Sequence, residues 1–128
     1  MVSEVTDGIE VSVKSKFEIE FSRPDESHFV FSYDITITND SDDTVQLLRR
    51  KWYTVDSTGE TNTVEGEGVV GQQPTLLRGE SHNYQSGMYF NSPMGKMNGS
   101  YIFRKLSSGE EFEVNIPEFH LIAPFVLN

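Results

Sequence analysis

Hydrophobic and polar residues alternate over several stretches of this chain, with the period of two that is typical of a half-buried β-strand. The clearest stretch is residues 29–37, in which every second residue is apolar: Phe29, Phe31, Tyr33, Ile35 and Ile37. Residues 10–21 alternate in the same way, and we expect that strand to break near Ser15 and Lys16. Each stretch predicts a strand with one face toward a core.

The rest of the chain predicts further strands over residues 45–55, 81–90, 97–106 and 112–122. In the first of these the apolar phase slips between Leu47 and Leu48, which indicates a bulge or a twist. Pro117 has no amide hydrogen for a central ladder, so it predicts a sheet edge or a bulge. The parity of the apolar residues reverses beyond this proline.

Clusters of Gly, Pro, Asn and Asp separate about seven predicted strands, and no ten-residue segment combines helical spacing with caps. This pattern predicts an all-β fold. A two-sheet β-sandwich fits it better than a closed barrel, because the strands are short and turns recur between them. At 128 residues the chain fits one domain, residues 1–128, that buries a single core.

The net charge of the chain disfavours one class of binding partner. The chain carries 20 acidic and 10 basic residues, a formal net charge of −10, so it repels a polyanion and nucleic acid is an unlikely partner. We interpret the one basic cluster, Arg49 to Lys51, as a solvated stretch of strand. The sequence has no cysteine, no apolar run of membrane-spanning length and no signal peptide at its start, from which we expect a cytoplasmic protein.

Three glycines near the middle, Gly66, Gly68 and Gly71, have the G-x-G-x-x-G spacing of a dinucleotide-phosphate loop. Such a loop must open a helix, whose N-terminus holds the anion. Here Gln72, Gln73 and Pro74 follow instead. We therefore expect a structural loop that crosses between the two sheets, with at least one glycine at positive φ.

The alternative use of this glycine loop is a weak anion site. Basic side chains that could assist it are those of Arg49, Arg50 and Arg78. We expect Val69 and Val70 to anchor the loop by packing.

No other motif predicts chemistry. The three histidines, His28, His82 and His120, lie in different predicted strands without metal-ligand spacing. Residues 79–83 lack the last glycine of a hydrolase nucleophile elbow, and no helix follows them. We predict no catalytic residue, no metal site and no cofactor, and we expect that the protein is not an enzyme.

From about Phe29 to Pro124 the sequence resembles the ApaG family. The matching positions form ordered blocks: Tyr33-x-Ile35-x-Ile37-x-Asn39, Val45-Gln46-Leu47-Leu48-x-Arg50-x-Trp52, Val64-x-Gly66-x-Gly68-Val69-Val70-Gly71-x-Gln73-Pro74, Gly79-Glu80, Tyr84-x-Ser86-Gly87, Pro93-x-Gly95-x-Met97-x-Gly99-x-Tyr101 and Ile116-Pro117-x-Phe119-x-Leu121-x-x-Pro124. Lys51 departs from a common histidine, and Arg78 from a common proline.

The resemblance implies a fibronectin type III-like or immunoglobulin-like two-sheet β-sandwich and little enzymology. Similar domains are appended to eukaryotic F-box proteins and to a DNA-polymerase-interacting protein, which implies a protein–protein interaction module. Bacterial names in the family imply an association with cobalt and magnesium efflux and with dinucleoside-polyphosphate metabolism. We expect another protein as partner; the alternative is a weak phosphate, nucleotide or divalent-cation-linked binding protein that uses the Gly66–Gly71 loop.

The C-terminal segment, residues 117–127, is the most apolar of its length, and two prolines interrupt it. Exposed apolar surface of this extent favours association. We expect Phe119 and Leu121 to pack within the chain. Phe125 to Leu127 either close one end of the sandwich or contact a second copy in a homodimer.

Overall fold

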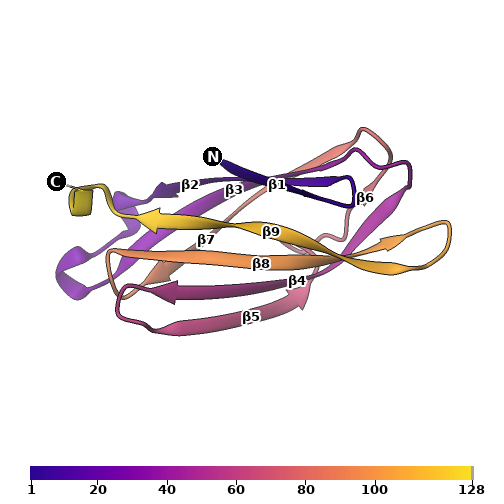
Figure 1. Cartoon of the computed structure of the whole chain (residues 1–128). Coiled ribbons are helices and arrows are strands. Elements are labelled where there is room, and N and C mark those ends of the chain that lie inside the picture. The colour runs from indigo at the N-terminus through magenta and orange to yellow at the C-terminus, as the bar shows by residue number, and fades with distance from the viewer. Residues whose placement is uncertain (128) are drawn as a thin grey trace.

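The computed structural model describes residues 1–127, and for Leu127 the backbone only. Nine strands and three short 3-10 turns follow one another along the chain (Figure 1). The strands are β1 (Val2–Thr6), β2 (Ile9–Phe17), β3 (Phe29–Asn39), β4 (Val45–Asp56), β5 (Thr61–Glu67), β6 (Thr75–Leu76), β7 (Ser81–Phe90), β8 (Met94–Lys105) and β9 (Glu111–Ile122). The 3-10 turns are η1 (Ile19–Phe21), η2 (Pro24–Glu26) and η3 (Pro124–Leu127). None of the described helices has the length and hydropathy that crossing a bilayer requires.

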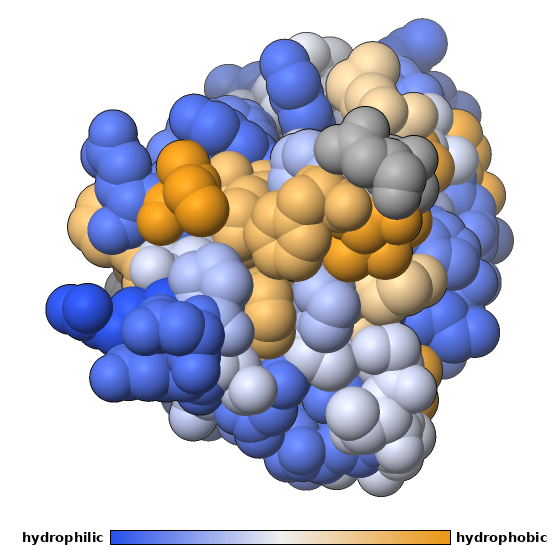
Figure 2. Space-filling model, turned by 90° about the vertical axis from the view of Figure 1, so that its left-hand side faces the viewer, coloured by the Kyte–Doolittle hydropathy of each residue, from blue (hydrophilic) through white to orange (hydrophobic). Residues whose placement is uncertain are grey.

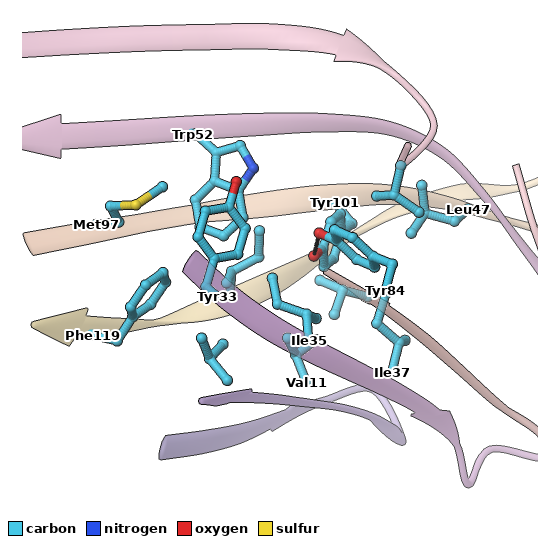
Figure 3. Close-up of a cluster of buried hydrophobic side chains, with 14 of the residues drawn as sticks. Val11, Tyr33, Ile35, Ile37, Leu47, Trp52, Tyr84, Met97, Tyr101 and Phe119 are labelled. Atoms are coloured by element: carbon cyan, nitrogen blue, oxygen red, sulfur yellow. Dashed lines mark hydrogen bonds between the residues drawn. The ribbon is translucent and has the colours of Figure 1, made fainter. Parts of the chain in front are cut away.

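Two antiparallel sheets form the layers of a sandwich, which confirms the predicted all-β, two-sheet fold. One sheet has the order β1-β2-β3-β7 and the other β5-β4-β8-β9, with the short β6 also paired to β4. The inward-facing side chains of both sheets form the core, as the strict alternation of buried residues in β3 shows. Figure 3 shows the centre of this core, where Val11, Ile35 and Ile37 face Leu47 and Tyr101.

The two lateral margins of the sandwich differ. At the first, which we call the closed side, β1 and β2 contact β9 of the opposite sheet. The hydroxyl of Thr6 accepts a hydrogen bond from the Asn115 amide at 3.2 Å, and the Ser15 hydroxyl donates to the His120 carbonyl at 3.4 Å. At the other margin, the open side, the edge strands are β5 and β7.

Two irregularities predicted from the sequence are confirmed. The pairing of β4 with β8 shifts register between Leu47 and Arg49, so the slip of phase does mark a bulge. Pro117 lies on the edge strand β9, inside a second register shift that leaves Ile116 opposite Gly99 and Phe119 opposite Met97. The missing amide hydrogen of Pro117 therefore interrupts no central ladder.

Three features of the N-terminal half differ from the prediction. Strand β2 runs through Ser15 and Lys16 without a break and ends at Phe17. Ile19 and Phe21 do not continue it, because the chain enters η1 and leaves both side chains mostly exposed. Strand β1 was not predicted, since its residues are largely exposed and show no buried face.

The prediction that the glycine loop crosses between the sheets is wrong. Strands β5 and β6, which flank it, both pair with β4, so the loop stays along one edge of one sheet. The crossing comes later, between β6 and β7, where Gly79 has a φ of +86°. Gly68 and Gly71 do have positive φ, at +63° and +76°, as expected.

The end of the sandwich that carries η3 has apolar surface at its centre (Figure 2). Phe125 packs against Phe17 and Phe29, with ring centroids 5.9 and 6.2 Å away. Ile19, Phe21 and Val126 are also exposed there. Through these aromatic contacts Phe125 packs within its own chain, and the homodimer contact stays a prediction. The side chain of Leu127 and all of Asn128 lie outside the described residues.

Candidate functional site

A groove with a volume of about 590 Å³ opens on the open side, between the inner faces of the two sheets. Inward-facing residues of β4 and β5 line one wall, and residues of β3 and β7 line the other. The lining residues are Tyr33, Arg50, Trp52, Thr54, Asp56, Glu60, Asn62, Val64, Ser86, Gly87, Met88, Tyr89, Phe90, Asn91 and Met97. Volumes of this size accommodate small ligands or a few residues of a peptide.

Aromatic side chains form the floor of the groove. Tyr33 from β3 and Trp52 from β4 point toward each other with ring centroids 5.4 Å apart (Figure 3). Phe119 contacts both rings from below, at 5.8 and 5.9 Å. The Tyr33 and Phe119 rings both contact the Trp52 ring and hold it in place, so one face of the groove is rigid and apolar.

Deeper in the sandwich, the hydroxyls of Tyr84 and Tyr101 are hydrogen-bonded to each other (Figure 3). Burial raises the pKa of both phenols, and the nearby positive charge of Arg50 lowers it by a smaller amount. Both phenols therefore stay protonated at neutral pH. The pair satisfies two polar groups inside the core and offers no anionic base to the groove.

Arg50 brings a positive charge to the groove from strand β4. A Cβ atom at position 66 would lie 2.8 Å from both Nη1 and Nη2 of Arg50, so the guanidinium sits against the bare backbone of Gly66. Nη1 donates to the carbonyl oxygens of Glu67 at 3.0 Å and Gly68 at 2.9 Å. These contacts fix the guanidinium at the wall of the groove.

Carboxylates stand at the other end of the groove. Asp56 ends β4 and is buried, and its Oδ1 accepts hydrogen bonds from the Thr58 hydroxyl, the Thr58 amide and the Glu60 amide. The bond from the Thr58 hydroxyl is the largest cause of a lowered pKa, so Asp56 is ionised at neutral pH. Glu60 is exposed, and its Oε2 accepts from Asn91 at 3.3 Å.

The three arginines of the predicted anion site do not converge. Arg49 points to the outer face of its sheet and pairs with Glu111 at 2.7 Å. Arg78 pairs with Asp42 at 3.2 Å, beside the turn between β3 and β4. Arg50 alone of the three lines the groove, and no described carboxylate lies within ion-pair distance of it.

The backbone of the glycine loop is largely occupied by internal hydrogen bonds. The Gly68 amide donates to Leu48, and Val69 and Gln72 exchange amide and carbonyl bonds. Val69 is buried and anchors the loop as expected, whereas Val70 is 64% exposed. The amides of Gly68, Val69 and Gln72 are therefore not available to an anion, in contrast to the N–H groups of a phosphate loop, and the loop carbonyls of Glu67 and Gly68 are bound to Arg50.

Sequence reasoning missed the groove because its residues resemble core residues. Trp52 packs in the core and also lines the groove, so its burial does not distinguish the two roles. The available signal was the polarity of inward positions on β4: Arg50 and Thr54 flank Trp52 at a spacing of two, where a closed sandwich would carry apolar side chains. Polar side chains at inward positions need access to solvent, and they have it at the open side.

Metal chemistry has no support in the geometry of residues 1–127. No group of three or more His, Asp or Glu side chains in this part of the chain is arranged to hold an ion. His28 instead lies against Tyr89, with ring centroids 4.7 Å apart and the rings tilted by 42°, and the His82 ring centroid lies 6.2 Å from that of Tyr84.

Comparisons with known proteins agree with this fold. The family model described as the ApaG domain matches residues 19–105. The chain is 42% identical over 120 residues to Protein ApaG of Vibrio vulnificus, covering 94% of each chain. It is 45% identical over 124 residues to Protein ApaG of Bradyrhizobium diazoefficiens, covering 97% of this chain and 95% of the relative.

A crystal structure of a protein assigned as ApaA from Bordetella pertussis superposes with a TM-score of 0.88 at 39% identity. The superposition covers 91% of this chain and 94% of that one.

Proposed function

This chain belongs to the ApaG domain family, and from the geometry of its groove we propose that it is a non-enzymatic protein-interaction module that binds a protein segment on its open side. The observation that carries the proposal is the pair of sheet edges at the groove. Within residues 1–127, β7 pairs only with β3, and β5 pairs only with β4. Each strand therefore has one edge whose N–H and C=O groups can pair with an added strand.

The side chains of the groove favour binding over catalysis. Tyr33 and Trp52 provide a fixed apolar surface, and Met88 from β7 is half-buried beside it. Asp56 is engaged by three hydrogen bonds through one oxygen, which suits a structural anion more than a general base that must exchange a proton. Aromatic residues and a methionine around a fixed arginine are the composition that protein interfaces favour.

A pair of matched variants tests the location of the binding surface. Val64 lies on the edge strand β5 and is 48% exposed, and Val5 lies on the edge strand β1 and is 61% exposed. Val64→Arg places a charged side chain at the mouth of the groove, while Val5→Arg makes the same change on the closed side.

We expect affinity capture from a bacterial lysate to recover a protein with the wild-type chain and with Val5→Arg, and to lose it with Val64→Arg. Melting temperatures within a few degrees of wild type show that both variants are folded. A captured protein that is lost with Val5→Arg and kept with Val64→Arg contradicts the proposal.

A further inference from the structure

Charges at the two ends of the groove specify its occupant more closely. We infer that the open side binds an extended peptide segment with an acidic side chain at the Arg50 end, a basic side chain at the Glu60 end and apolar residues between them. This inference rests on the proposed function, because it assumes that a protein segment occupies the groove.

The acidic position of the segment follows from Arg50. Its Nη1 is occupied by the carbonyls of Glu67 and Gly68, and the backbone of Gly66 supports the plane of the guanidinium. The guanidinium has five N–H donors in a fixed fork, so donors remain for a ligand. No carboxylate of the described chain pairs with Arg50, so a ligand carboxylate can bind it without displacing one, and a guanidinium held in place loses little entropy when it binds.

The basic position follows from the opposite end. Asp56 and Glu60 both line the groove, and neither has a Lys or Arg partner within ion-pair distance in residues 1–127. Three acidic residues on the outer face of the β5-β4-β8-β9 sheet, Glu65, Glu111 and Glu118, differ in that each is paired with a basic residue of the chain. A Lys or Arg of the ligand completes the Glu60 end.

The distance between the two ends sets the spacing of the charges. Arg50 pairs with Gly66 in the β4–β5 ladder, and the Asp56 amide donates to Glu60 at the other end of that ladder. Asp56 lies six positions after Arg50 along β4, which corresponds to about 20 Å at roughly 3.3 Å per residue. An added strand that runs along β5 has the same rise, so its two charged residues lie about six positions apart.

The middle of the groove selects apolar side chains. Trp52, Tyr33 and Val64 lie between the charged ends. A strand directs alternate side chains to one face, so the residues between the charges that share their face meet this aromatic floor. The predicted ligand is therefore a strand with an acid, apolar residues at every second position, and a base.

Free phosphate is the competing ligand for Arg50. Pyrophosphate could bind the guanidinium, but the carboxylates of Asp56 and Glu60, about 20 Å away, would contribute nothing to its binding. A peptide with both charges uses both ends, and this difference separates the two ligands experimentally.

Trp52 provides a direct readout, because it is the only tryptophan of the chain and lines the groove. We would titrate the full chain with ten-residue peptide pools that lack tryptophan and carry mixed Val, Thr and Tyr at the remaining positions. The pools have Glu and Lys six positions apart in either order, have one or both charged residues replaced by Gln, or have Glu at both positions.

One order of the Glu/Lys pool is expected to change Trp52 emission with a dissociation constant about tenfold or more below that of the Gln/Gln pool, with singly charged pools between them. The difference should shrink as salt is raised, because exposed charge pairs are screened.

Charge reversal tests each end separately. Glu60→Lys changes an exposed residue, so folding is preserved, and it should weaken the Glu/Lys pool and strengthen a pool with Glu at both positions. The matched control is Glu65→Lys, which makes the same change on the outer face of the adjoining strand β5 and should leave the preference unaltered. Arg50→Gln should abolish the preference for Glu over Gln at its position.

The possible outcomes separate a failure of the charge assignment from a failure of the proposed function. If all pools change Trp52 emission with equal affinity, the charge assignment is overturned while a peptide-binding groove stands. If micromolar pyrophosphate displaces the peptide pools from the wild-type chain but not from Arg50→Gln, Arg50 binds a phosphate and the inference fails. If no pool binds and random ten-residue display libraries also yield no ligand for the groove, the proposed function fails with it.

Discussion

The closed and open sides are margins of the same sandwich, yet their inward-facing residues differ in kind. On the closed side, Val11 and Val13 of β2 and Val114 and Ile116 of β9 are almost fully buried. On the open side, the corresponding inward positions of β4 include Arg50 and Thr54, and those of β7 include Ser86 and Met88. The closed side excludes water from its inward positions, whereas the open side leaves polar and half-buried side chains accessible in a groove.

Under the proposed function, this difference assigns stability and binding to separate margins of the sandwich. Apolar residues at both margins would bury more surface and add stability. Polar inward residues reduce that contribution on the open side, and they leave two sheet edges and an arginine accessible there. The comparison predicts that stability depends on the closed side and binding on the open side.

The largest expected effect comes from truncating matched side chains on the two margins. Leu121 of β9 is 1% exposed, so Leu121→Ala should lower the free energy of unfolding by about 2–5 kcal/mol. Met88 of β7 is half-buried, and Met88→Ala should cost about 1 kcal/mol while weakening peptide binding. Chemical denaturation of both variants measures the difference, and equal costs would remove the distinction between the margins.

The glycine loop beside the open side gives the next largest effect. A Cβ on Gly68 would lie 2.3 Å from the Gln72 carbonyl oxygen, while one on Gly71 would meet no heavy atom within 4 Å. Both have positive φ, so Gly71→Ala reports the backbone cost alone, about 1 kcal/mol, and Gly68→Ala should cost about 2 kcal/mol or more. Comparable losses in thermal or urea melts would show that the loop relaxes around the added atom.

The end of the sandwich that carries η3 provides an intermediate case. Phe125 is 46% exposed and packs on Phe17 and Phe29, so Phe125→Ala should cost about 1–2 kcal/mol. If this aromatic packing is its whole role, sedimentation of the wild type gives a monomer and the melt does not change with concentration. A concentration-dependent melt that Phe125→Ala abolishes would instead support the homodimer.

The smallest effect is the pH dependence contributed by Asp56 at the end of the groove. Its pKa is lowered in the folded state, chiefly by the Thr58 hydroxyl, so the ionised form adds stability above the pKa of the unfolded chain, about 4. That contribution is lost as the pH falls through the lower folded pKa. Asp56→Asn should therefore be less stable than wild type at pH 7, by about 1 kcal/mol, and the gap should close toward pH 2.

Urea melts at several pH values measure this gap. A gap that stays constant between pH 7 and pH 2 would show that ionisation of Asp56 contributes nothing to stability.

Much of the fold follows from periodicity, and the reason is the strength of the alternation. Strand β3 buries every second residue from Phe29 to Asn39, so its pattern alone predicts the strand and its inner face. Bulges are also visible in the sequence, since a slip of phase at Leu47 has few other causes. Strand β1 has no such pattern, because an edge strand with exposed residues is defined by its pairing with β2.

The candidate site was less accessible to sequence reasoning. The G-x-G-x-x-G spacing drew attention to glycines whose structural roles are to seat Arg50 and to turn the chain. Arg50 itself was part of the predicted anion site. It is separated from Arg49 because the two side chains lie on opposite faces of β4, and Arg49 pairs with Glu111. Arg78 is held elsewhere by its pairing with Asp42. Those contacts join residues far apart in the sequence, which local patterns do not specify.

The most direct test of the account is a nitrogen-15 NMR titration of the full chain with a peptide selected from a random ten-residue display library. We predict that amide shifts concentrate on β5 and β7 and include the indole N–H of Trp52, while β1 and β9 on the closed side are unchanged. Shifts confined to the closed side, or to the end that carries η3, would contradict the assignment of binding to the open side.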